Sequence, residues 1–214
     1  HELRTPIATI RSHAQLIERR AKAHPEVIAQ SVKYIDDESH QMETLVEELL
    51  ALTRADRATF DFEQYDLSAS LAALAKNTAP LFPQRLVTEI DSGIQLTAHE
   101  ASVTQIVTNL LNNASKYAEP NTTIKLVLKL INDQTVIQVI DEGSGIAAED
   151  KAHIFERFYR SSNVRGTIPG TGLGLAIVAE LASLNGAKLT LNDNVPQGSI
   201  FSVRFGKRVR NKGG

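Results

Sequence analysis

The chain has 214 residues, 42% of them apolar, and a formal net charge of −2 at pH 7. This length accommodates one large domain or two modest ones with a buried core, and the charge lacks the positive excess typical of nucleic-acid-binding proteins, so we expect no nucleic-acid partner. The absence of cysteine excludes disulfides and thiolate metal sites and fits a reducing compartment.

Helical repeats dominate residues 1–57, which contain no glycine and only two prolines. Apolar residues recur there at alternating intervals of four and three, on either side of a polar break at "AKAHPE". This heptad spacing predicts two helices, each with a narrow apolar seam, paired as an antiparallel hairpin. The positions are Leu3, Ile7, Ile10, Ala14 and Ile17 in the first helix and Ile28, Val32, Ile35, Ser39, Met42, Val46 and Leu49 in the second.

Two helices alone leave such a seam half covered, and two arrangements would cover it. In one, the hairpin forms a homodimer whose four helices bury a common core. In the other, the hairpin packs on the second half of its own chain. Leu3 is in phase with the seam, which favours a helix that runs through Pro6 at the cost of a missing hydrogen bond and a kink.

From about residue 58 onward, glycines appear and short β-rich runs alternate with helical ones. The pattern predicts a mixed sheet covered on one face by three main helices, so the fold class is α+β: a helical hairpin followed by an α/β sandwich. A hairpin turn is expected at Asn132 and Asp133, and Gly186 should close the last helix. The predicted helices are 67–79 (after Asp66), 100–118 and 172–186, and the predicted strands are 86–90, 94–98, 122–131, 135–141, 187–193 and 199–205.

Two glycine clusters lie at the ends of predicted elements. "DEGSGI" (141–146) follows a strand, and "GTGLG" (170–174) opens a helix. The free N–H groups and the dipole at a helix N-terminus favour anions, although the spacing fits neither the P-loop nor the dinucleotide fingerprint. A phosphate site and a pair of plain turns both explain these clusters.

Asn109 and Asn113 project from one face of the predicted helix 100–118, because four residues separate them. Amide oxygens suit Mg²⁺, and Lys116, about one turn beyond Asn113, could meet a phosphate as a point charge. A polar outer face on an amphipathic helix is the alternative explanation, and Asn112 fits either one.

The first six residues, "HELRTP", allow two interpretations. Thr5 caps a helix that Pro6 starts, or His1 already lies on that helix. At about 100° per residue, a helical His1 points away from the apolar seam, toward solvent or a partner, with Thr5 on the same side and Glu2 beside it. In the second interpretation His1 is a nucleophile next to a general base.

The order of these motifs points to one family. "HELRTP", "NLLNNASKY", "DEGSGI", "FERFYR" and "GTGLGLAIV" follow one another within residues 1–206. They resemble the H, N, G1, F and G2 boxes of the sensor histidine kinases of two-component systems, whose Bergerat-type ATP-binding fold is shared with gyrase and Hsp90. The resemblance implies a dimerisation and histidine phosphotransfer domain over 1–58, a linker over 59–65, a catalytic ATP-binding domain over 66–206 and a basic tail over 207–214.

The resemblance also implies a reaction and its partners. ATP and Mg²⁺ would support autophosphorylation on His1, and the phosphoryl group would pass to an aspartate in the receiver domain of a response regulator. Glu2 would accept the proton from the other imidazole nitrogen. Thr5 matches the position at which some members orient a water that dephosphorylates the regulator, and this phosphatase activity is left open.

A homodimer through the hairpin is part of the same expectation. So is a cytoplasmic fragment of a membrane-anchored bacterial sensor kinase, since the chain begins at His1 without a methionine. No apolar run approaches the ~18 residues of a membrane span, so we expect no membrane contact by the fragment itself.

The nucleotide site is likewise implied residue by residue. Asn113 matches the Mg²⁺ ligand, and Asn109 lines the same site. Asp141 would accept a hydrogen bond from the adenine amino group, while Ile146 would help to wall the apolar pocket. The other nucleotide contacts implied are Lys116, Tyr117, Gly143, Gly145, Arg160, Gly170, Thr171, Gly172, Leu173 and Gly174.

Residues 147–169 match a lid that we expect to be poorly ordered without nucleotide. Phe155 and Phe158 are expected to anchor it by packing, and Arg165 is a further candidate for the γ-phosphate. The chain departs from the family before the N box, where His99 and Thr104 stand at about the places of an aspartate and an arginine.

Two other functions fit the same fold. An ATPase of the gyrase or Hsp90 type carries a glutamate one turn before the Mg²⁺ asparagine, whereas Asn109 stands there in this chain, and a neutral amide is a poor base. The second alternative is a non-catalytic module that binds nucleotide and dimerises or docks without transferring phosphate.

Overall fold

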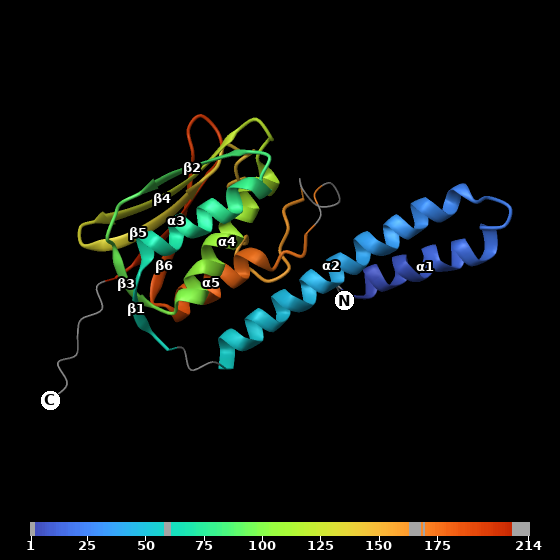
Figure 1. Cartoon of the computed structure of the whole chain (residues 1–214), viewed down its shortest axis with the longest axis horizontal. Helices are drawn as coiled ribbons and strands as arrows, with labels where there is room; N and C mark the ends of the chain where they lie inside the picture. Colours follow the sequence, from blue (N-terminus) through green and yellow to red (C-terminus); the bar gives the residue numbers. More distant parts are fainter. Residues whose placement is uncertain (1–2, 58–60, 163–167, 169, 207–214) are drawn as a thin grey trace.

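The computed structural model describes residues 3–57, 61–162, 168 and 170–206. It contains a long helical hairpin followed by a layered α/β unit, and the second helix of the hairpin extends beside that unit (Figure 1). No helix among these residues is long and apolar enough to cross a membrane.

The hairpin is formed by α1 (Arg4–Arg20) and α2 (Glu26–Arg57). The chain reverses at the predicted polar break, where the His24 N–H donates to Arg20 O (2.8 Å) and α2 starts directly after Pro25. Ring stacking joins the two helices, with the centroids of His13 and Tyr34 4.5 Å apart. The prediction of a helical hairpin is therefore confirmed.

The kink expected at Pro6 is not required by the observed helix. Pro6 is buried in the first turn of α1, which starts at Arg4, and Leu3 precedes it with helical φ and ψ. Backbone N–H groups in a first turn have no intrahelical acceptor, so a proline there removes no hydrogen bond. Thr5 lies inside the helix and does not cap it.

A five-stranded mixed sheet forms the base of the second unit, in the order β2-β4-β5-β7-β6. The β2–β4 pair is parallel and the other three pairs are antiparallel. Asn132 and Asp133 adopt φ of 51° and 60°, as the predicted two-residue hairpin turn between β4 and β5 requires. The strands are β2 (Arg85–Ile90), β4 (Thr123–Ile131), β5 (Gln134–Ile140), β6 (Ala187–Asp193) and β7 (Ser199–Phe205).

Three helices cover one face of this sheet: α3 (Leu67–Thr78), α4 (Glu100–Tyr117) and α5 (Gly174–Leu184) (Figure 1). Asp66 caps α3 by accepting from the Ala69 N–H at 2.9 Å. His99 caps α4: its Nδ1 lies 3.3 Å from the Ser102 N–H and 2.6 Å from Ser102 Oγ. His99, which stands where the family usually has an aspartate, thus accepts the N-cap hydrogen bond that an aspartate would accept.

Apolar side chains from both layers fill the space between the helices and the sheet. Burying each large one contributes about 1.5–3 kcal/mol relative to leaving it in water, so this layer fixes α4 and α5 on the sheet. The fully buried side chains include Ile106, Leu110 and Leu111 from α4, Leu126 and Leu128 from β4, Ile137 from β5 and Ile177 from α5.

A second, two-stranded sheet pairs β1 (Glu63–Asp66) with β3 (Gln95–Ala98). The strand at β3 was predicted, whereas β1 falls in the segment expected to be a linker. A short 3₁₀ turn, η1 (Ala79–Leu81), leads from α3 toward β2.

Candidate functional site

A cavity of about 470 Å³ lies where four segments meet: α4, the glycine loop before α5, the segment around 154–160, and α2. The family resemblance assigns the first three segments to one site, and the structure brings them together. The lining residues are His40, Gln41, Thr44 and Glu48 from α2, Asn109, Asn112, Asn113, Lys116 and Tyr117 from α4, Ile154, Tyr159 and Arg160, and Gly170, Thr171, Gly172, Gly174 and Leu175.

The α4 wall carries the predicted amides and the predicted lysine. Asn109, Asn113 and Lys116 follow one face of the helix, and all three line the cavity. The Asn109 side-chain nitrogen is buried, and no described residue bonds to it. A buried amide nitrogen without a partner needs a hydrogen-bond acceptor from a polar ligand or water, whereas the side-chain oxygens of Asn109 and Asn113 are the atoms that would suit a cation.

The glycine loop forms the opposite wall. Gly170 leaves space for the Lys116 ammonium, which a side chain at position 170 would strike. Gly172 has a φ of +75° and packs its α-carbon against the backbone of Phe158 and Tyr159. Thr171 Oγ1 accepts from the Leu173 N–H (3.2 Å) and donates to a carboxylate oxygen of Glu48.

No side chain caps the N-terminus of α5, where Leu173 holds the N-cap position before Gly174. The first N–H groups of that helix therefore face the cavity end with the positive end of the helix dipole. This arrangement is one that favours an anion.

Asp141, which follows the last residue of β5, is only 5% exposed. Its Oδ1 accepts from the N–H groups of Gly143 (2.8 Å) and Ser199 (3.2 Å). Burial raises the pKa of this carboxyl group, and the two hydrogen bonds oppose that rise. Among the described residues no donor is found on Oδ2, which leaves that oxygen available to a ligand.

The G1-box residues lie beside the cavity without lining it. A Cβ at Gly143 would come within 2.6 Å of the Tyr117 carbonyl oxygen, so this glycine is needed for the close approach to α4. Gly145 adopts a φ of +74°, and Ile146 is partly buried against the core. Tyr117 therefore links the Asp141 end of the site to the Lys116 end.

The first part of the lid is held at Asp150. This carboxylate, 8% exposed, accepts from Tyr159 Oη (2.5 Å) and from Ser161 Oγ (2.6 Å). The Ser161 bond first, then the Tyr159 bond, lower the pKa of Asp150. These two hydrogen bonds tie Tyr159 and Ser161 to Asp150. Arg165 lies outside the described residues.

The two lid phenylalanines differ from each other. Phe155 packs edge-on against Phe201 of β7, with centroids 6.5 Å apart, as a packing anchor should. Phe158 is 40% exposed, so the expectation of anchoring by burial is wrong for it. It adopts a φ of 66°, and its N–H donates to Gly172 O (3.0 Å), which joins the lid to the glycine loop through the backbone.

Charges of both signs gather around the cavity. The pKa of Lys116 is lowered by loss of solvent first and by Arg160 second, while Glu48 opposes that fall. Burial raises the pKa of Glu48, against the Thr171 hydrogen bond and the charge of Lys116. The Arg160 guanidinium also donates to Ile168 O. Two cations and one carboxylate therefore share this end of the site.

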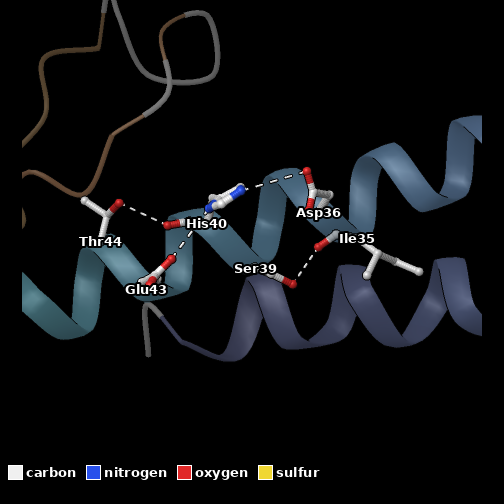
Figure 2. Close-up of polar contacts among 6 residues, drawn as sticks. All are labelled: Ile35, Asp36, Ser39, His40, Glu43 and Thr44. Atoms are coloured by element: carbon white, nitrogen blue, oxygen red, sulfur yellow. Dashed lines mark hydrogen bonds and ion pairs between the residues drawn. The ribbon is translucent and has the colours of Figure 1, made fainter.

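The sequence motifs do not predict the wall that α2 contributes. Thr44 and Glu48 are four residues apart, and His40 lies one further turn back, so one helix face meets the cavity. Figure 2 shows His40 between two acidic neighbours on that helix, 3.9 Å from Asp36 Oδ2 and 3.5 Å from Glu43 Oε2. The only sequence signal was this polar i, i+4, i+8 spacing, which an exposed face shares.

The proposed phospho-acceptor end is described only in part. His1 and Glu2 lie outside the described residues. Thr5 is exposed on α1, and its carbonyl accepts from Thr9 Oγ1 at 3.2 Å. Leu3 is partly buried against the core cluster that includes Leu45 of α2.

Comparison with known proteins gives the family. Residues 98–209 match "Histidine kinase-, DNA gyrase B-, and HSP90-like ATPase", and residues 1–58 match "His Kinase A (phospho-acceptor) domain". Sensor histidine kinase YkoH of Bacillus subtilis is 33% identical over 97% of this chain and 46% of its own length. Signal transduction histidine-protein kinase ArlS of Staphylococcus haemolyticus is 32% identical over 96% of this chain and 46% of its own length.

The chain therefore spans about half the length of these relatives. Among solved structures, the Acinetobacter baumannii histidine kinase AdeS shares the fold over 98% of both chains, with a TM-score of 0.73 at 23% identity. The family matches, in the order hairpin then sandwich, agree with the observed architecture. The chain belongs to the histidine kinase-, DNA gyrase B-, and HSP90-like ATPase family, with a His Kinase A (phospho-acceptor) domain before the ATPase domain.

Proposed function

We propose that this chain transfers the γ-phosphoryl group of ATP to His1 and then to an aspartate of a response regulator. The observation that carries the proposal is the convergence of Lys116, Thr171 and the uncapped α5 N-terminus with the amides of α4 around one cavity. Phosphoryl transfer needs positioning and charge neutralisation more than covalent help, and this wall offers both. The α2 helix of the hairpin forms the other side, so the domain that carries His1 already adjoins the site.

The two ends of the cavity region suit the two ends of a nucleotide. Asp141 Oδ2 would accept from the adenine amino group, with Gly143, Gly145 and Ile146 close to the base. Lys116 and Arg160 would face the phosphates, together with the loop from Gly170 to Gly174. Tyr117, between the two ends, would lie against the nucleotide.

Mg²⁺ would be held by Asn113, with Asn109 beside it, and when bound it would offset the negative charge of the phosphates. The orphaned amide nitrogen of Asn109 fits this assignment, since a reoriented amide would present its oxygen to the same space.

At the acceptor, one imidazole nitrogen of His1 would form the new P–N bond as the bond from the γ-phosphorus to the ADP oxygen breaks. Glu2 would take the proton from the other imidazole nitrogen. Thr5, exposed on α1, would be placed to orient a water if the chain also dephosphorylates its regulator.

We also propose that the hairpin dimerises. Several apolar seam residues remain exposed in the single chain: Ile7 by 50%, Ile28 by 38%, Val32 by 52% and Val46 by 44%. A four-helix bundle between two copies would bury them. We propose domain boundaries at 1–58, 59–65 and 66–206, with a basic tail over 207–214. We also propose that the chain is the cytoplasmic part of a membrane-anchored kinase.

The reaction class can be tested with γ-labelled ATP and Mg²⁺. A histidine kinase leaves label on the protein that is labile in acid and stable in base. Free labelled phosphate without labelled protein would instead support the ATPase alternative. Nucleotide that binds and stays unchanged would support the non-catalytic docking module.

A further inference from the structure

We propose that the carboxylate of Glu48 in α2 occupies the phosphate end of the nucleotide site when no nucleotide is bound. A triphosphate must displace this carboxylate in order to bind. In this role α2 both closes the site and sets its affinity for ATP. The inference rests on the nucleotide site proposed above and adds to it a residue from the helical domain.

The contacts of the Glu48 carboxylate are those that a phosphate would use. Thr171 Oγ1, in the glycine loop, donates to it directly. Lys116, which borders Gly170 in the same loop, attracts it electrostatically. The free N–H groups of the first turn of α5 begin at Gly174, directly after Leu173, so the helix dipole favours a negative charge there as well.

A carboxylate and a phosphoryl oxygen compete well for such a site. Both are anionic acceptors that form charge-assisted hydrogen bonds to hydroxyl, ammonium and backbone donors. They would compete for the same donors, since Glu48, Lys116 and Thr171 all line the same space and the Thr171 hydroxyl already donates to Glu48. Two anions left there together would also repel each other at low local dielectric.

Apolar contacts hold Glu48 in place. Leu45, three residues earlier on α2, is 4% exposed and belongs to the buried core cluster of the second unit, and Leu49 packs against that cluster. One face of α2 thus combines an apolar anchor with a charged tip, and α2 runs beside α5 (Figure 1).

The free energy of this docking depends on what occupies the phosphate end. With the end empty, Glu48 neutralises Lys116 and α2 stays against the glycine loop. With a triphosphate bound, Glu48 loses its donors and the contact at α2 weakens, which frees the second unit to move along the hairpin. Nucleotide binding and release of α2 are then reciprocally coupled.

The first test measures binding of a non-hydrolysable ATP analogue with Mg²⁺, and of adenosine, to the full 214-residue chain by calorimetry. Glu48→Gln keeps the shape and an acceptor for Thr171 but removes the charge. We expect it to tighten analogue binding by about five- to tenfold, the change for losing one charge-assisted contact, and to leave adenosine binding unchanged. Glu47→Gln, exposed on the same helix, makes the same charge change and should alter neither.

The second test reports the release of α2. Because the chain has no cysteine, Leu45→Cys introduces a single thiol at a 4% exposed position. Its reaction with a thiol reagent should be slow in the free chain, several-fold faster with the ATP analogue, and unchanged by adenosine. A labelling rate that the analogue does not raise would show that the triphosphate binds without moving α2 and would overturn the inference.

The outcomes separate this inference from the proposed function. Unchanged or weaker analogue binding by Glu48→Gln, in a chain whose wild type binds the analogue, overturns the role of Glu48 alone. A wild type that binds neither ligand overturns both. Tighter binding by Glu48→Gln in a chain that never forms phosphoprotein supports the role of Glu48 and overturns the kinase.

Discussion

The Lys116 ammonium lies against Gly170, in the space that a side chain at position 170 would take. This contact joins α4 to the glycine loop, two segments more than fifty residues apart in the sequence. An added Cβ would meet different atoms at two glycines of this loop. At Gly170 it would meet the end of a flexible side chain, whereas at Gly172 it would meet backbone.

Gly170→Ala should therefore displace Lys116, and the φ of +159° at this glycine adds some backbone strain. We expect ATP affinity to fall by about tenfold, the loss of one charge-assisted contact, while the melting temperature falls by less than it does in Gly172→Ala, where a Cβ would strike backbone. Calorimetric binding and thermal unfolding of the same sample check both parts.

Gly172→Ala is the matched comparison. Its φ of +75° and the 2.8 Å approach of a Cβ to the Phe158 and Tyr159 backbone predict a loss of about 1–3 kcal/mol in stability as well as binding. Equal melting temperatures for the two variants would contradict this difference between Gly170 and Gly172.

Asp141→Asn should lower the affinity for nucleotide and raise the stability of the fold. The amide oxygen can keep the bonds from Gly143 and Ser199, but its NH₂ group would face the adenine amino group, donor against donor. We expect ATP affinity to fall at least about tenfold, with a higher melting temperature at pH 7, because the buried charge is gone.

The contribution of Asp141 to the stability of the fold should depend on pH. Its folded pKa is raised by burial, so the folded chain holds this proton to higher pH than the unfolded chain does. The stability it contributes is present below its ordinary pKa and is lost as the pH rises through the folded pKa. The stabilising effect of Asp141→Asn should accordingly grow over that rise, and an effect independent of pH would contradict the assignment.

Asp150→Asn should destabilise the fold at neutral pH, the opposite of the effect expected for Asp141→Asn. Hydrogen bonds from Ser161 and Tyr159 lower the pKa of Asp150, so its contribution is present above its ordinary pKa and is lost as the pH falls through the lowered folded value. We expect a lower melting temperature at pH 7 and convergence with wild type in acid. Glu149→Gln, an exposed neighbour, should follow wild type throughout.

Local spacing was enough to predict most of the α4 wall. Asn109, Asn113 and Lys116 share a face because of helical periodicity alone, and that holds wherever the helix packs. The Asn132–Asp133 turn was equally local, since few other residues adopt its positive φ angles readily.

Features that depend on distant contacts could not be predicted in this way. The strand β1, "EQYD", lacks an apolar alternation and is a strand only because β3 pairs with it. Glu48 looks like any charged residue of a solvated helix until α2 is placed against Thr171. Phe158, which has a positive φ, likewise donates its N–H to Gly172, fourteen residues away.

The exposed seam predicts a dimer that a single charge should weaken. Val32, 52% exposed on α2, would be buried between copies, so Val32→Asp should raise the dissociation constant of the dimer at least about a hundredfold. Gln30→Asp makes the same charge change at an exposed position outside the seam and should leave the dimer intact. Sedimentation equilibrium of the wild type and the two variants measures the three dissociation constants. Equal dissociation constants for all three would argue against this interface.

The most direct test of the kinase assignment is to locate the labelled residue after incubation with γ-labelled ATP and Mg²⁺. His40 is the natural competitor to His1, because it lines the nucleotide cavity between Asp36 and Glu43. The account predicts that His1→Gln abolishes the acid-labile label and that His40→Gln retains it. Label that survives His1→Gln, or that disappears only in His40→Gln, would contradict His1 as the phospho-acceptor.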